Sequence, residues 1–70
     1  MQIELTQQEA LVLFEWLHQN SEKDELFAHP AEQYVLWRME AQLEKALTEP
    51  CMPDYWQLVA TARTQVEESW

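Results

Sequence analysis

The chain has 70 residues, enough for one small domain and near the lower limit for folding around a single hydrophobic core. Thirteen acidic residues against four basic ones give a formal charge of −9, which argues against direct binding to nucleic acid or to an anionic membrane, since both need clustered Lys and Arg. With 47% hydrophobic residues and no glycine, the chain is expected to fold, and to lack the tight turns of β-rich proteins.

The N-terminal region predicts an extended segment followed by a helix. Residues 2–5 alternate polar and apolar side chains. Thr6 then has the features of an N-cap, and Glu9 completes a capping box, so a helix is predicted over Gln7–Gln19. Its apolar side chains spread over an arc of roughly 220°, wider than the stripe of an ordinary surface helix. We therefore expect this helix to be central to the fold or shared with a partner. The positions left for solvent are Gln8, Val12, Glu15 and Gln19.

A polar connection over residues 20–29 leads into a second helix. One extra short helical turn is possible around residues 22–28. Pro30 suits the first helical position, and the helix is predicted to continue to about Thr48. Apolar residues at helical spacing form its expected core stripe, namely Leu36, Met39, Leu43 and Ala46, with Val35 and Leu47 beside them. A second patch of Tyr34, Trp37 and Ala41 lies more than a quarter turn away and must pack against something else.

The third helix is predicted to follow the break at Pro50. Asp54 is its expected N-cap, with Gln57 in the capping-box position. One apolar stripe runs along it, made of Tyr55, Leu58, Val59, Ala62 and Val66 and extended by Trp70. Three helices joined by short connections predict an all-α fold, a small three-helix bundle of antiparallel type that forms a single domain over residues 1–70.

Few ionisable residues have a spacing that suits catalysis or metal binding. Glu15 and His18 have the E-x-x-H spacing of di-iron bundle proteins, but no second such motif exists and Glu15 is predicted to face solvent. His29 is interpreted as a helix-entry residue. Cys51 is the only cysteine, so no intrachain disulfide can form. We predict no metal site, no catalytic residues and no cofactor, and therefore no enzymatic activity.

The chain has more apolar residues than one three-helix core can cover, and this is the feature that indicates a function. Four residues exceed what one three-helix core can cover and form the candidate interaction surface, namely Val12, Trp16, Tyr34 and Trp37. Trp and Tyr concentrate at the anchors of protein interfaces. Alternatively, the N-terminal segment with Ile3 and Leu5, or the turn at Leu26 and Phe27, folds over these residues.

The function expected from these features is a protein–protein interaction or regulatory module, acting as a homodimer or as a small subunit docked on another protein. The alternative is an acidic inhibitor of a basic partner, such as an antitoxin, an immunity protein or a DNA mimic, which the evenly distributed charge favours. No small-molecule ligand is evident. A cytoplasmic location is expected, because no secretory signal is present and the longest apolar run, Ala10–Phe14, is too short to cross a bilayer.

Three stretches carry a resemblance to known sequences. The run from Leu5 to Leu17, followed by the residues from Ala31 to Glu40 and by Pro53-Asp54-Tyr55, resembles a group of short, uncharacterised bacterial helical proteins. The resemblance implies a compact bacterial helical domain and no known activity, and it transfers no functional residues to this chain.

Overall fold

The fold was analysed in a computed structural model that describes residues 2–70. Three α-helices and two short 3-10 turns follow one another along the chain, and no strand occurs among the described residues. The elements are α1 (Gln7–Asn20), η1 (Asp24–Leu26), α2 (Pro30–Ala46), η2 (Glu49–Cys51) and α3 (Tyr55–Ser69). The predicted all-α fold is confirmed, and η1 lies within the range given for the extra turn.

The start of α1 is fixed by the predicted capping box. The Thr6 hydroxyl accepts a hydrogen bond from the Glu9 backbone N–H at 3.1 Å, and the Glu9 carboxylate accepts one from the Thr6 N–H at 2.8 Å. These bonds satisfy two groups that a helix start otherwise leaves without partners. At the other end, the Asn20 side-chain amide donates to the Trp16 carbonyl oxygen at 2.8 Å.

The ends of α2 are set by a side chain and by the core. Nδ1 of His29 accepts a hydrogen bond from the Ala31 N–H at 3.0 Å, and Pro30 occupies the first helical position. The helix ends at Ala46, two residues earlier than predicted. Leu47 adopts an extended backbone conformation, and its side chain is buried in the core. Burial of Leu47 thus ends α2 before the polar Thr48.

The predicted start of α3 is confirmed in position, and its predicted end is wrong. Asp54 occupies the N-cap position, but its side chain makes no capping hydrogen bond, because its backbone does not adopt the extended conformation that an N-cap side chain needs. Trp70 does not extend the apolar stripe: it lies past the helix end and 92% of it is exposed. The stripe therefore ends at Val66, which is half-buried.

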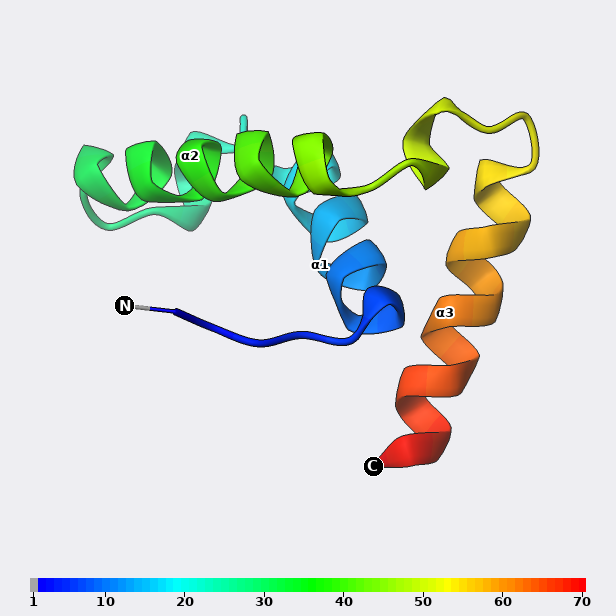
Figure 1. The fold of residues 1–70 in the computed structure, drawn as a ribbon. Helices are drawn as coiled ribbons and strands as arrows, with labels where there is room; N and C mark the ends of the chain where they lie inside the picture. Colours follow the sequence, from blue (N-terminus) through cyan, green and yellow to red (C-terminus); the bar gives the residue numbers. More distant parts are fainter. Residues whose placement is uncertain (1) are drawn as a thin grey trace.

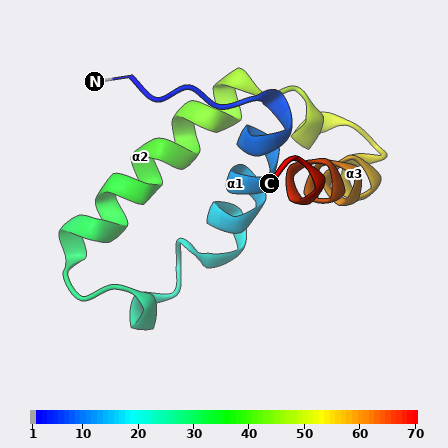
Figure 2. The same cartoon turned by 90° about the horizontal axis from the view of Figure 1, so that it is seen from below.

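The three helices form a bundle with α1 in the middle. α1 packs against both α2 and α3, whereas α2 and α3 have little contact with each other. Figure 2 shows α2 and α3 on opposite sides of α1. In Figure 1, α3 runs across the direction of α2 and not antiparallel to it. The expected antiparallel arrangement is therefore wrong for this pair. No helix in the described part of the chain has the length and apolar character to cross a membrane.

The hydrophobic core lies mainly between α1 and α3. Its buried residues come from α1, from α3 and from the residue that follows α2: Leu11, Phe14, Leu17, Val59, Ala62 and Leu47. No residue within α2 is buried. Of its expected core stripe, Leu36, Met39 and Leu43 are half-buried and Ala46 is exposed, which corrects the prediction. α2 packs on one neighbouring helix only, so its apolar face is covered on one side.

Candidate functional site

A long apolar groove lies between α1, α2 and the N-terminal segment. Its volume is about 680 Å³. The lining is apolar apart from two side chains of α2, and we call the following set the apolar groove: Ile3, Leu5, Leu13, Trp16, Leu17, Val35, Leu36, Arg38, Met39, Gln42, Leu43 and Ala46. The half-buried stripe of α2 thus forms one wall, and the side of α1 that turns away from α3 forms the other.

The N-terminal segment borders this groove without covering it. In Figure 2 it passes in front of the C-terminal end of α2, and Figure 1 shows it set apart from that helix. Ile3 and Leu5 both line the groove, yet 66% of Ile3 and 43% of Leu5 are exposed. One alternative predicted from the sequence is that this segment folds over the apolar residues that the core cannot cover. Trp16 remains 48% exposed beside it, so the segment widens the apolar surface.

A second hollow adjoins the groove toward η1. Its volume is about 520 Å³, and it shares Trp16, Val35 and Leu36 with the groove. Leu26 and Phe27 line its outer edge, where Leu26 is exposed and Phe27 is half-buried. The turn at Leu26 and Phe27 therefore also borders Trp16 without enclosing it. Trp16 and Val35 stand where the two hollows meet.

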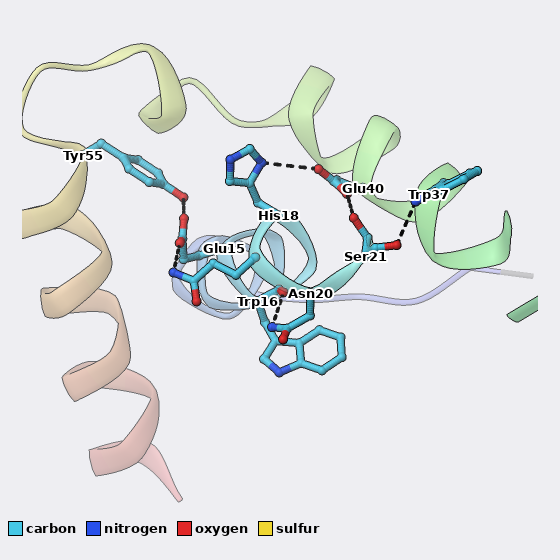
Figure 3. Close-up of polar contacts among 9 residues, drawn as sticks. Glu15, Trp16, His18, Asn20, Ser21, Trp37, Glu40 and Tyr55 are labelled. Atoms are coloured by element: carbon cyan, nitrogen blue, oxygen red, sulfur yellow. Dashed lines mark hydrogen bonds and ion pairs between the residues drawn. The ribbon is translucent and has the colours of Figure 1, made fainter. Parts of the chain in front are cut away.

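A polar network joins α2 to the end of α1, on the side of these two helices that faces away from the groove (Figure 3). The Ser21 hydroxyl donates to Glu40 Oε1 at 2.8 Å, and the Ser21 carbonyl oxygen accepts a hydrogen bond from the Trp37 indole N–H at 3.0 Å. Nδ1 of His18 lies 3.5 Å from Glu40 Oε2. Ser21 is buried, so these bonds replace the water that its polar atoms would otherwise bind. The network holds the groove walls in one relative position.

A buried carboxylate connects α1 to α3. Glu15 is fully buried, although the sequence placed it in solvent. Its Oε1 accepts a hydrogen bond from the Tyr55 hydroxyl at 2.6 Å, and its Oε2 accepts one from the Gln19 side-chain amide (Figure 3). Burial, followed by this bond to Glu15, raises the pKa of Tyr55 above its ordinary value. The prediction failed because α3 covers a position that helical periodicity alone assigned to the outer face of α1.

The E-x-x-H pair does not form a metal centre in the described residues. His18 stacks on Phe14, with 6.1 Å between ring centroids, and both oxygens of Glu15 already accept hydrogen bonds. No group of three or more potential metal-ligating side chains occurs among residues 2–70. The geometry therefore assigns Glu15 and His18 to packing between helices.

The four predicted interface residues do not share one surface. Val12 is half-buried and packs against the core, and Trp16 lies in the apolar groove. Tyr34 and Trp37 pack on each other at 5.8 Å between ring centroids, and Trp37 is bonded to Ser21. In Figure 3 the indoles of Trp16 and Trp37 point away from each other. Of the four residues, only Trp16 thus lines the apolar groove.

Sequence reasoning missed the α2 wall of the groove because its spacing is that of a core stripe. Leu36, Met39 and Leu43 were assigned to the core. Arg38 and Gln42 accompany them in the lining, and these polar residues beside the stripe were the one available signal that the stripe is not enclosed.

Comparisons of the chain with protein-family models, with curated proteins and with solved structures found no match. The resemblance to short bacterial helical proteins therefore stays a prediction.

Proposed function

We propose that this chain is a protein–protein interaction or regulatory module, acting as a homodimer or as a small subunit docked on another protein, and that the apolar groove is its binding surface. The observation that supports the proposal is the groove itself: a concave face about 680 Å³ in volume, with an exposed tryptophan and one charged side chain in its lining. Large exposed apolar surfaces on small proteins mark contact sites.

The groove has the features of a site for a protein and not of a site for chemistry. Trp16 is an aromatic side chain of the type that anchors interfaces. Catalysis by general acids and bases needs a titratable pair within reach of a substrate, and Arg38 is the only charged residue of the lining. These features support a binding role without enzymatic activity. We also propose a cytoplasmic location and a bacterial source, as the sequence predicts.

The alternative, an acidic inhibitor of a basic partner, is favoured by a different observation. The charge of −9 is carried by residues spread over all three helices and both connections. The two functions differ in their response to salt. Association through the apolar groove should persist at high ionic strength, whereas binding through the acidic surface should weaken steeply as the Debye length falls from about 10 Å at 0.1 M to about 3 Å at 1 M salt.

Photo-crosslinking from the groove tests the proposed function. Val35→Cys, made together with Cys51→Ser, places one thiol in the groove lining for a benzophenone maleimide label. The matched control is Lys45→Cys in the same background, on an exposed position of α2 outside the groove. In an extract of the native host, we expect the label at Val35 to form a defined protein adduct and the label at Lys45 to form none. An equal pattern from both positions, or no adduct from either, contradicts the proposal.

A further inference from the structure

The protein exposes more surface than a folded monomer of its mass normally does. Its accessible surface is 5601 Å² for 8.4 kDa, whereas the usual scaling for monomers gives about 4,600 Å² at this mass. The excess of about 1,000 Å² is close to the roughly 800 Å² that each partner contributes to a stable interface of standard size. The excess is therefore of the size that one contact of standard area would cover.

The exposed apolar side chains indicate where a partner would bury surface of this chain. In the apolar groove, Ile3, Val35 and Trp16 are 66%, 61% and 48% exposed. They come from three separate segments and still line one concave face. A partner seated there would cover all three at once. The other exposed tryptophans lie outside the groove: Trp37 on α2, Trp56 on α3 and Trp70 beyond the end of α3.

The charge of the groove indicates what kind of partner fits. Arg38 is its only charged lining residue, although the chain has thirteen acidic residues. Within residues 2–70, no carboxylate lies within salt-bridge distance of Arg38. A basic partner would bring like charge to Arg38. An acidic partner with an apolar face would match both features.

We propose that the occupant of the apolar groove is a second copy of this chain, in a symmetric homodimer with Trp16 and Val35 at its centre and Arg38 paired with a carboxylate of the other copy. This inference rests on the proposed function and names its partner. A second copy is acidic and carries the same apolar face, and a two-fold axis brings that face onto itself. Glu4 lies between the groove residues Ile3 and Leu5 in the sequence, and Glu32 lines the adjoining hollow, so a second copy offers Arg38 carboxylates from near the same face.

The molar mass in solution tests this inference. In light scattering behind a sizing column, we expect the full chain to have twice its mass of 8.4 kDa at high micromolar concentration and about 0.15 M salt. Trp16→Ala should raise the dissociation constant at least about tenfold. The matched control Trp70→Ala, which removes an indole outside the groove, should change it less than about threefold. A mass of 8.4 kDa at every concentration overturns the inference, as does a dimer that Trp16→Ala leaves intact.

Val35→Glu is a second variant, which tests the same face in case Trp16→Ala fails to fold. Val35 is largely exposed in the single chain, so this change should keep the far-UV circular dichroism while placing a carboxylate in the centre of the contact. We expect it to give a folded monomer. A folded Val35→Glu protein that still dimerises as tightly as the wild type contradicts the assigned face.

Two matched variants test the proposed contact of Arg38. Arg38→Glu and Lys45→Glu make the same change in net charge on the same helix, but only Arg38 lines the groove. Arg38→Glu should weaken the dimer at least about tenfold, and Lys45→Glu should have a much smaller effect. Equal weakening by both would show that net charge, and not a specific pair, controls association.

The two proposals fail in different ways. A wild-type protein that stays monomeric, together with a specific adduct to another protein from the label at Val35, overturns the homodimer and leaves the proposed function standing. A monomer with no adduct from Val35 overturns both.

Discussion

The hydroxyl of Tyr55 on α3 donates a hydrogen bond to Oε1 of Glu15 on α1 across 2.6 Å. Glu15 is fully buried, and Gln19 donates to its second carboxylate oxygen. A carboxylate in this position is stable only while its oxygens have donors, since burial removes the water that would otherwise solvate them. The packing of α1 on α3 therefore depends on this polar contact as well as on the apolar core around it.

Removal of the Tyr55 hydroxyl should destabilise the fold. In Tyr55→Phe we expect the free energy of unfolding to fall by about 1–3 kcal/mol, because a buried acceptor loses its donor. Urea denaturation followed by circular dichroism measures the change. Tyr34→Phe is the matched control, since Tyr34 is exposed and its hydroxyl makes no hydrogen bond within the described residues. Equal losses in the two variants would contradict the role given to the Glu15 contact.

Stability should also decrease in alkaline solution through the same residue. Burial and the bond to Glu15 raise the pKa of Tyr55 in the folded chain, so the unfolded chain loses this proton first, at about pH 10. The resulting stabilisation is complete below about pH 10 and is lost as the pH rises above it. Urea midpoints between about pH 8 and pH 11 should fall more for the wild type than for Tyr55→Phe. Parallel curves would assign the alkaline loss to other groups.

Trp37 is expected to act within the chain and not at the interface. Its indole N–H donates to the carbonyl oxygen of Ser21 at 3.0 Å. Trp37→Phe keeps an aromatic ring beside Tyr34 but removes this donor, so the free energy of unfolding should fall by about 0.5–1.5 kcal/mol. The molar mass by light scattering should stay that of the wild type. A loss of association in Trp37→Phe would instead return Trp37 to the binding surface, where the sequence placed it.

The two predicted N-caps should differ in their effect on stability. Thr6→Ala removes an observed capping bond and should cost about 0.5–2 kcal/mol. The Asp54 side chain makes no such bond, so Asp54→Ala should change the free energy of unfolding by less than about 0.5 kcal/mol. Both are measured by urea denaturation. A larger loss at Asp54 than at Thr6 would contradict the capping geometry described for α1 and α3.

Local features of the chain were predictable because they depend on near neighbours. The Thr6–Glu9 capping box, Pro30 at the start of α2 and the turn near residues 22–28 all follow from residues a few positions apart. Helical periodicity likewise identified the apolar positions of each helix. Of the four candidate interface residues, Trp16, Tyr34 and Trp37 are exposed, since the apolar positions of α1 and α2 cover more of each helix than one neighbour can bury, and Val12 is half-buried.

The sequence by itself thus determined the helices, their approximate ends and the charge of the surface, whereas the tertiary structure alone decided which apolar faces are covered. Periodicity marks an apolar face but does not say how close the next helix lies. α3 crosses α1 and covers Glu15, whose partner Tyr55 is 40 residues away. α3 leaves α2 uncovered, so the stripe from Leu36 to Leu43 forms a groove wall where the sequence predicted core. Burial is a property of packed elements, and the packing of α1 between α2 and α3 sets it here.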